Sequence, residues 1–571
     1  MDNQRLLIWA TFALLAWMTY TAWMKDYGPQ PEPVQPAVTE AAPEAIDAEN
    51  GLPELDITEG GVPPAPGQPA AEADVATAPT APVITVRTDV LNLEISTTGG
   101  TLQGATLLNY PVAKDRPDLL VQMLGTDREN LGLVRTGLRL GTGASPDHKA
   151  EFSSPRVSYE LGGAEQLVVP LNWRNDEGVE LEKRLVFRPG SYRIDIEQEL
   201  RNTRSTPLVA DSYAQVLRRS HEPERSMFDV DSYSFDGPIV YNGEKSEKID
   251  RDDLIKKGPY DASTANGWLG TIQHHFVNAI VPPADELHKF HIAVNNSRDV
   301  ATASVISGKR NVAPGASETF RTTAFVGPKL QSQLEEIDPK LKLTVDYGWL
   351  TILSQPLFWL LSFVYDYVAN WGVAIIIVTI LIKLAFYKLT ESSGRSMAKM
   401  RNLQPRMKAL QERYKDDRQA LSQAMMDLYK REKVNPAAGC LPILIQMPFF
   451  LAFYWVLLES VEMRQAPFAL WITDLSSRDP FFILPLIMGA AMFFQQKLNP
   501  APADPVQARV MQIMPVIFTA FFAFFPAGLV LYWVTNTLLS IAQQWKINRV
   551  VEAQAKAEKA HKPKAKKSKK D

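Results

Sequence analysis

The stretch Ile375–Phe386 reads IIIVTILIKLAF, an apolar run that one threonine and one lysine interrupt. It is the centre of a segment from Trp371 to Leu389 that is long enough to cross the hydrocarbon of a bilayer. Further apolar runs lie near the start of the chain and after the central stretch: Leu6–Trp23, Cys440–Leu458, Pro480–Phe494, Val510–Phe525 and Ala527–Ile541. We therefore predict a membrane protein with six spanning helices.

Two features of these runs refine the prediction. Pro526-Ala527-Gly528 separates the last two runs, which together hold about 32 residues, too many for one span, so we expect a tight helical hairpin there. Several runs are shorter than a usual span. Local thinning of the bilayer matches short spans to the membrane.

Charge predicts the orientation of the spans. The loop Lys388–Lys433 carries twelve Lys or Arg against six acids, whereas Glu459–Asp479 carries two against four. Because basic loops stay in the cytoplasm, the first loop should be cytoplasmic and the second outside. Six spans then place both chain ends in the cytoplasm and residues 27–340 outside, which is the periplasm in a cell with an outer membrane.

The segment that precedes the central stretch has three parts. Residues 27–84 carry ten acidic groups and no Lys or Arg, and they are rich in Pro and Ala, which indicates a flexible tether. From Val83 short alternating runs such as Leu91–Ile95 predict strands. We interpret residues 83–340 as one all-β domain, a sandwich of two sheets.

These patterns give a multi-domain membrane protein: an all-α polytopic core of six transmembrane helices plus an all-β periplasmic sandwich. The first run lacks an A-x-A-like cleavage site, so an uncleaved anchor is favoured over a signal peptide. Residues 345–368 mix aromatic and polar groups, as in a helix that lies in the membrane interface. The expected parts are an anchor at 1–26, a tether at 27–82, the β domain at 83–340, an interfacial helix at 345–368, the core at 369–545 with a cytoplasmic hairpin at 390–435, and a basic tail at 546–571.

Lys383 is the first candidate functional residue. A charge inside a spanning segment is costly, so it normally faces a wet cavity or a partner. The alternative is snorkelling, because Lys383 lies about 9 Å along the helix axis from the predicted cytoplasmic end, within reach of a lysine stem. Thr379 and Tyr387 share its helical face.

Polar residues recur in two other spans. Gln446 lies mid-span, and Tyr532, Asn536 and Ser540 recur every four residues, with Gln543 close to the same line. Such a stripe favours a wet interior. Interhelical hydrogen bonding explains it equally well.

The cytoplasmic loop contains a second pattern. Apolar residues at 3-4 spacing predict an antiparallel helical hairpin with a narrow seam, formed by Met400, Leu403, Met407, Leu410, Tyr414, Leu421, Met425 and Leu428. The seam packs on itself or docks a partner, and methionine-rich faces adapt to varied partners.

Other features are less specific. The last sixteen residues hold eight lysines, which are either solvated or bind RNA phosphates or anionic lipid. The one cysteine, Cys440, forms no intramolecular disulfide and is expected to be a small buried residue. We find no phosphate-binding glycine loop and no H-E-x-x-H motif, and His274 and His275, being adjacent, would point to opposite faces of a strand. We expect no catalytic site, no metal and no cofactor.

The C-terminal half resembles the YidC membrane protein insertases of Gram-negative bacteria over residues 345–550, and the anchor and β domain do so more loosely. The motifs that carry the resemblance are SMAKM at 396–400, EKVNP at 432–436, GC at 439–440, IQMP at 445–448, RQAPFALWI at 464–472 and FPAGLVLY at 525–532.

The resemblance implies six spans, a periplasmic β-supersandwich, and a hydrophilic groove that is open to cytoplasm and lipid. Members insert membrane proteins alone or with the Sec translocon, and a positive residue lines the groove. Many relatives carry arginine where this chain has Lys383, so a diffuse attractor for acidic tails is favoured over a geometric carboxylate clamp. The residues that we assign to the groove are Lys383, Thr379, Tyr387, Gln446, Tyr532, Trp533, Asn536 and Ser540.

The resemblance also implies the partners: nascent membrane proteins, the Sec translocon and membrane lipids, with the hairpin receiving substrate. Ribosome contact through the basic tail is an open alternative, and a monomer is the expected state. Two other functions are alternatives. A transporter or channel would use Lys383 as an ion site but should show internal repeats and paired broken helices, which we do not find. An exported carbohydrate-active enzyme would depend on the β domain. Deletion of most of residues 90–320 should therefore abolish the function of such an enzyme, whereas an insertase should keep much of its function.

Overall fold

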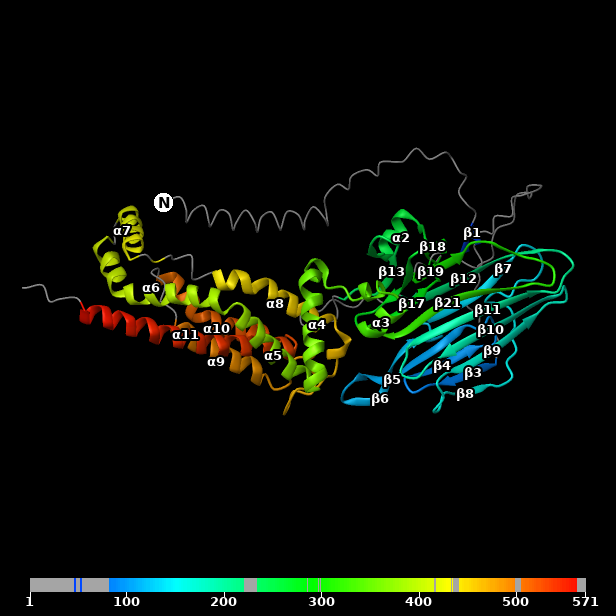
Figure 1. The fold of residues 1–571 in the computed structure, drawn as a ribbon, viewed down its shortest axis with the longest axis horizontal. Coiled ribbons are helices and arrows are strands. Elements are labelled where there is room, and N and C mark those ends of the chain that lie inside the picture. Colours follow the sequence, from blue (N-terminus) through cyan, green and yellow to red (C-terminus); the bar gives the residue numbers. More distant parts are fainter. Residues whose placement is uncertain are drawn as a thin grey trace, which may run out of the picture. The chain divides into compact units, whose positions relative to one another are not determined.

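The computed structural model describes residues 46–47, 52–53, 82–219, 234–284, 286–295, 297, 299–414, 417–432, 434, 441–498 and 505–561. It divides into two compact units. The helical unit holds Ile352–Trp455 and everything described after Ala466, and the β unit holds the rest up to Thr351 together with Val456–Gln465. Figure 1 labels many of the elements of both units. The predicted anchor, most of the tether, Cys440 and the lysine-rich end of the tail lie outside the described residues.

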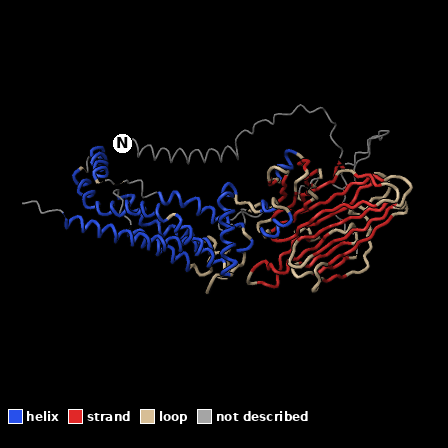
Figure 2. Tube along the Cα trace, in the orientation of Figure 1, coloured by secondary structure: helices blue, strands red, loops and turns tan. Residues whose placement is uncertain are grey.

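The β unit contains two large sheets, as the alternating runs predicted (Figures 1 and 2). Among the described residues the first sheet has eight strands, all paired antiparallel. Their spatial order is β14 (Ser246–Lys248), β13 (Gly237–Tyr241), β16 (Trp268–Ile272), β17 (Phe276–Val281), β21 (Ser317–Pro328), β11 (Arg193–Asn202), β10 (Val179–Phe187) and β9 (Leu167–Arg174).

The second sheet has eleven strands within the described residues. Its main path is β15 (Tyr260–Thr264), β18 (His288–Val294), β19 (Val300–Ser307), β12 (Leu208–Arg219), β7 (Gly132–Leu140), β5 (Leu102–Ala113), β4 (Leu91–Ser96), β3 (Val83–Arg87) and β8 (Ser158–Glu160). Beside this path, β20 (Arg310–Val312) pairs with β12 and β6 (Arg116–Leu124) pairs with β5. The β3–β8 pair is parallel.

Smaller elements complete this unit. They are the helices α2 (Arg251–Lys257) and α3 (Gln331–Ile337), the turns η2 (Leu341–Thr344) and η3 (Gly348–Leu350), and an isolated pair of two-residue strands, β1 (Ile46–Asp47) and β2 (Leu52–Pro53). The pair β1–β2 lies inside the segment that we predicted to be a flexible tether. That prediction took no account of local pairing between two short apolar stretches.

Strand parity determines what enters the core. Along β10 the odd-numbered residues from Val179 to Phe187 are buried, and the even-numbered ones are partly or fully exposed. Period-2 alternation of this kind is what a strand with one buried face requires. The odd set includes Lys183, whose side chain is fully buried. Trp268, Phe290 and Phe325 are also fully buried in this unit.

The helical unit consists of long apolar helices and one helical hairpin. Its elements are α4 (Thr351–Val368), α5 (Trp371–Ala385), α6 (Tyr387–Arg413), α7 (Arg418–Arg431), the first part of α8 (Leu441–Glu459), α9 (Ile483–Leu498), α10 (Pro505–Phe522) and α11 (Ala527–His561). The helix break predicted at Pro526-Ala527-Gly528 is present, because α10 ends at Phe522 and α11 begins at Ala527. Helix α11 continues to His561, beyond the boundary at residue 545 that we expected.

Some of these helices are long and apolar enough to cross a membrane. Among the described residues, Gly348–Val368 meets both requirements by itself, and α5 with α6 meets them as a pair that bends by 69°. Gln446–Glu459, Ile483–Leu498 and Arg509–Phe522 are apolar but shorter. Residues 348–368 are thus long enough to span, whereas the sequence indicated an interfacial helix.

The run Trp371–Leu389 was predicted as one continuous helix, and this is wrong. The helix breaks at Phe386, whose amide is shared between the carbonyls of Ile382 and Leu384. Thr390 Oγ1 donates to the carbonyl oxygens of Phe386 and Tyr387, each at 3.0 Å. The Phe386 carbonyl also accepts from the Thr390 amide at 3.0 Å, so the threonine hydroxyl adds a local bond within the first turn of α6.

Candidate functional site

The site begins on α5. The Asn370 side chain caps this helix by accepting from the Val373 amide, a common start signal. Apolar residues fill the helix up to Lys383, which lies in its last turn and is partly buried. The lysine ammonium is therefore held at the end of an apolar helix, one turn before the break at Phe386.

The ammonium of Lys383 has a partner on α11. Lys383 Nζ donates to Ser540 Oγ at 2.7 Å, and Ser540 Oγ donates to the Asn536 carbonyl oxygen at 2.7 Å. The hydroxyl hydrogen of Ser540 is thus donated within α11, and the oxygen of the same hydroxyl accepts from the Lys383 ammonium. Snorkelling was the alternative for Lys383, but this side chain is engaged by a neighbouring helix.

A second bond brings α8 to the same group. Gln446 Nε2 on α8 donates to Asn536 Oδ1 on α11. Gln543 Nε2, further along α11, donates to Thr390 Oγ1 on α6 at 2.7 Å. Lys383, Gln446, Asn536 and Ser540 are thus joined across three helices in an otherwise apolar region.

A small cavity lies beside Lys383. Its volume is about 20 Å³, and it is lined by Ile382, Lys383, Phe386, Leu389, Thr390, Gln446 and Phe449. A cavity of this size with polar groups in its wall has room for about one water molecule. The sequence analysis missed Thr390 and Phe449. Thr390 lies beyond the break at Phe386, so the spacing of one continuous helix does not place it beside Lys383, and no local pattern in the sequence signals it.

The structure does not bring four of the predicted groove residues into this group. Thr379 is buried, and its hydroxyl donates to the Ile375 carbonyl of its own helix at 2.6 Å. The Tyr532 ring stacks on Phe453 with centroids 4.4 Å apart, and the Trp533 ring meets Phe450 edge-on at 4.7 Å. The Tyr387 backbone carbonyl, at 3.4 Å from Gln543 Nε2, lies next to the group.

At the other end of α5, the loop between α8 and α9 packs on the helix start. Asn370 Nδ2 donates to the Phe468 carbonyl at 2.9 Å, and a Cβ on Gly372 would lie 2.1 Å from the Phe468 ring. The buried Asp479 accepts from Trp471 Nε1 at 3.0 Å and from the Leu484 amide at 2.7 Å. This loop is therefore an ordered, close-packed structure at that end of the helices.

The predicted hairpin forms from α6 and α7. Leu403, Met407 and Val434 are buried together, with Met400, Met425, Leu428 and Tyr429 packed against them. Leu410, Tyr414 and Leu421, which we also assigned to the seam, lie outside this cluster and are partly exposed. The apolar seam is therefore present away from the turn of the hairpin and absent next to it, and partner docking stays a prediction.

Two features of the β unit concern possible chemistry: a predicted arrangement of two histidines, and a pocket that was not predicted. His274 and His275 do not point to opposite faces, because they precede β17 in a bend and their rings stack with centroids 3.8 Å apart.

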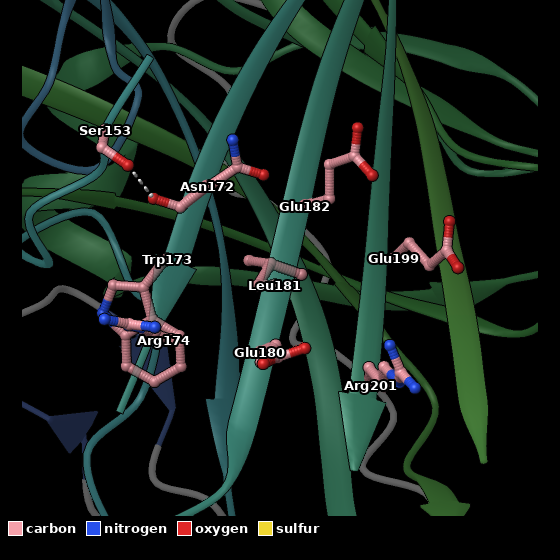
Figure 3. Close-up of a pocket in the computed structure, with 9 residues that line it drawn as sticks. All are labelled: Ser153, Asn172, Trp173, Arg174, Glu180, Leu181, Glu182, Glu199 and Arg201. Atoms are coloured by element: carbon pink, nitrogen blue, oxygen red, sulfur yellow. Dashed lines mark hydrogen bonds between the residues drawn. The ribbon is translucent and has the colours of Figure 1, made fainter. Parts of the chain in front are cut away.

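A polar pocket of about 520 Å³ lies over β9, β10 and β11 (Figure 3). Of its carboxylates, Glu182 and Glu199 lie 3.7 and 3.4 Å from Arg184. Charges on the face beside the edge strand β9 disfavour pairing with another sheet.

Comparison with known proteins identifies the family. The family described as the 60Kd inner membrane protein matches residues 363–555, and the YidC periplasmic domain matches residues 83–360. The membrane protein insertase YidC of Nitrosococcus oceani is 45% identical over 97% of this chain and 99% of its own length. The chain belongs to the YidC family of membrane protein insertases. The YidC proteins of Methylococcus capsulatus and Pseudomonas fluorescens are 44% and 42% identical, each over 97% of this chain and 99% of their own length.

Solved structures add less. A crystal structure of an active YidC insertase with its first transmembrane domain resolved aligns with 81% of this chain and 94% of its own, at 19% identity and a TM-score of 0.36. A galactose mutarotase related enzyme from Lactobacillus acidophilus covers 43% of this chain and 97% of its own, at 9% identity and a TM-score of 0.30. Neither similarity is strong enough to carry an argument about function.

Family membership settles the main prediction. The protein is a membrane protein insertase of the bacterial inner membrane, its β unit is the periplasmic domain of the family, and its substrates are membrane proteins. The transporter and tethered-enzyme alternatives are thereby set aside. The four-residue group Lys383, Gln446, Asn536 and Ser540 is the candidate functional site within the helical unit.

Proposed function

We propose that the four-residue group forms the inner wall of a hydrophilic groove. The hydrophilic flank of a nascent membrane protein enters the bilayer through this groove. The observation that carries this proposal is the Lys383–Ser540 hydrogen bond of 2.7 Å between two otherwise apolar helices. A charged flank costs several kcal/mol in hydrocarbon. Polar groups fixed along the path lower that cost by replacing part of its hydration.

The groove binds the substrate non-covalently and catalyses no covalent reaction. Lys383 supplies a positive charge that attracts acidic flanks. The side-chain amides of Gln446 and Asn536 supply hydrogen-bond donors and acceptors, which can bind flanks of many different sequences. The apolar part of the substrate then partitions into lipid, which the hydrophobic effect drives without a nucleotide. No cofactor or metal enters this proposal.

The proposed topology has six spans: residues 6–23, α5, α8, α9, α10 and the first part of α11. Helix α5 has 15 residues and is therefore about 22 Å long. This is shorter than the roughly 30 Å of a bilayer core, so the membrane thins beside the protein and shortens the crossing. Both termini and the α6–α7 hairpin are then cytoplasmic, and α4 lies at the membrane interface.

The proposed partners follow the family resemblance. The insertase acts as a monomer, alone on small proteins and with the Sec translocon on larger ones, and the α6–α7 hairpin receives substrate. The lysine-rich tail contacts the ribosome or anionic lipid.

The test uses reconstituted protein and a set of single-span substrates whose translocated tails carry increasing numbers of acidic residues. Lys383→Leu should slow insertion most for the most acidic tails, because it removes the attracting charge. Lys383→Arg should retain insertion. Lys388→Leu is the matched control, since Lys388 is an exposed lysine only five residues further along the chain. Equal insertion by Lys383→Leu and Lys388→Leu across the whole series would refute the role of the charge.

A further inference from the structure

The cavity beside Lys383 is nearly closed in this structure. Its volume of about 20 Å³ has room for about one water molecule. An acidic side chain has several heavy atoms, so it reaches the ammonium only after part of the cavity wall moves away. The wall is formed by residues of α5, of α6 with the break that precedes it, and of α8.

Two of these walls are fastened to α11. Helices α5 and α6 are each bonded to α11 by a hydrogen bond of 2.7 Å, through Lys383 and Thr390. Further along α6, Ala398 is buried together with Ile547 and Val551 of α11. The walls that α5 and α6 supply are therefore fixed to one another through α11.

The second half of α8 is also firmly packed. Phe453 is fully buried, and its ring stacks on the Tyr532 ring of α11 with centroids 4.4 Å apart. The Ala452 carbonyl, equally buried, accepts from Ser354 Oγ of α4 at 3.4 Å. Contacts with two helices thus hold this half of α8 in place.

From Gln446 to Phe449, α8 is held by one hydrogen bond and one ring contact among the described residues. Gln446 Nε2 donates to Asn536 Oδ1 of α11. The Phe449 ring meets the Phe386 ring with centroids 5.2 Å apart and an angle of 66° between the ring planes, a contact that we call the ring pair. Met447 is 42% exposed. The release of these two contacts therefore frees the wall that α8 supplies.

A proline separates the two halves of α8. Pro448 lies inside the helix and has no amide hydrogen, so the helix lacks one of its main-chain bonds there. Sharp bends in helices occur mostly at such residues. Bending at Pro448 moves the part of α8 that lines the cavity and leaves the packed second half undisturbed.

We propose that the first half of α8 is a gate to the cavity: it moves about Pro448, separates the ring pair and lets a substrate side chain reach Lys383. The hydrogen bond between Gln446 and Asn536 holds this gate closed in the resting protein. The inference rests on the proposed groove function, because it describes how a substrate enters that groove.

The test measures how fast a water-soluble maleimide labels a cysteine in the cavity wall of the full-length protein in lipid nanodiscs, without substrate. The reporter is Leu389→Cys, since Leu389 lines the cavity, in a Cys440→Ser background that removes the other thiol of the chain. Pro448→Ala supplies the missing amide donor and stiffens α8. Gln446→Leu removes the bond to Asn536.

Each variant has a matched control. Pro515→Ala changes the proline inside α10, a helix that contributes no residue to the cavity wall. Gln496→Leu changes a partly exposed glutamine of α9, which also lies outside the wall. Both controls should be labelled at the rate of the reporter protein.

We expect Pro448→Ala to slow labelling about fivefold and Gln446→Leu to accelerate it about fivefold. A fivefold change corresponds to about 1 kcal/mol, the usual net contribution of one hydrogen bond. The sign for Gln446→Leu is decisive, because a fixed cavity would become less polar and would be labelled more slowly. Asn536→Leu, alone or combined with Gln446→Leu, should give the same acceleration, since all three variants remove one shared bond.

Two results would overturn the proposal: labelling of Pro448→Ala at the rate of Pro515→Ala, or labelling of Gln446→Leu no faster than that of Gln496→Leu. If Pro448→Ala does not fold, the second criterion decides alone. The labelling reaction contains no substrate. Failure of the Lys383 charge test would therefore remove the proposed function without changing the labelling rates, and unchanged labelling rates would remove the gate and leave the charge test standing.

Discussion

Lys183 provides a sharp test of how the two sheets of the β domain are joined. It lies at the centre of β10, is fully buried, and donates through Nζ to the carbonyl oxygens of Gly99 and Thr136, at 2.7 and 2.8 Å. Thr136 lies on β7 of the other sheet. The Nζ atom also lies 4.7 Å from the centroid of the Phe152 ring. One lysine thus links the sheets through two main-chain acceptors.

Burial makes this link depend on pH. It lowers the pKa of Lys183 from 10.5 to about 7, while the charge of Asp147 opposes the shift. Between these two pH values the unfolded chain binds a proton that the folded chain does not. The free energy of unfolding therefore rises with pH across this window, and falls toward a constant value below pH 7. One pKa unit corresponds to about 1.36 kcal/mol, so the contribution of Lys183 should increase by about 2 kcal/mol from pH 7 to pH 9.

Lys183→Met removes the titration and leaves two buried carbonyls without donors, which costs about 1–3 kcal/mol for each. At pH 7 this loss is largely offset by relief of the ammonium's desolvation, so the variant should be close to the native protein in stability. At pH 9 it should be less stable by about 2 kcal/mol more than at pH 7. Burial also lowers the pKa of Lys329 to about 8, but this group is common to both proteins and cancels in the comparison.

Pulse proteolysis in urea measures the unfolding of the β domain within the intact protein. Native protein, Lys183→Met and the control Lys149→Met, which changes an exposed lysine, are compared at pH 7, 8 and 9. The control should follow the native protein at every pH. If the free energy of unfolding changed with pH in the same way for the native protein and Lys183→Met, the pKa of Lys183 would not be lowered in the folded protein. That result would refute the proposed pH dependence.

Two further changes test the loop that packs on α5. Gly372→Ala places a methyl group 2.1 Å from the Phe468 ring, so we expect the free energy of unfolding to fall by about 1–3 kcal/mol and proteolysis within residues 466–475 to become faster. The control is Gly163→Ala, where a Cβ meets nothing within 4 Å. Asp479→Asn keeps one acceptor but loses the second carboxylate oxygen, which caps α9 at the Leu484 amide, 2.7 Å away. This should cost about 1 kcal/mol and raise amide exchange in the first turn of α9, and unchanged exchange there would contradict the capping role.

The sequence was informative wherever one periodic pattern decides the outcome. Period-2 alternation indicated the strands of the β domain. The inward position of Lys183, between Leu181 and Leu185, follows the same parity but was not predicted. The general rule that lysine avoids the interior argues against this position. Its acceptors, Gly99 and Thr136, lie 84 and 47 residues away along the chain, so no local pattern could reveal them. The break at Phe386 escaped prediction for a related reason, because neither proline nor glycine marks it.

Helical spacing identified the right face of α5 but could not say which groups on it meet. Thr379 shares the face of Lys383, yet its short side chain returns its hydrogen to the carbonyl four residues back, as do Thr519 and Thr535, at 2.6–2.8 Å. Such local bonds satisfy a hydroxyl without any neighbouring helix. Lysine and glutamine have longer side chains, and Lys383 and Gln446 therefore reach α11.

Ser540 shows how the two kinds of bond combine. It returns its hydrogen to the Asn536 carbonyl like the threonines, and this leaves only acceptor lone pairs for the Lys383 ammonium. An ammonium has three N–H donors. Ser540 Oγ takes one of them, and among the described residues no second hydrogen bond of Nζ accompanies it. Ser540 thus fixes the position of the ammonium relative to α11, and under the proposed groove function the remaining N–H donors of Lys383 are the ones that an acidic or polar substrate segment would meet.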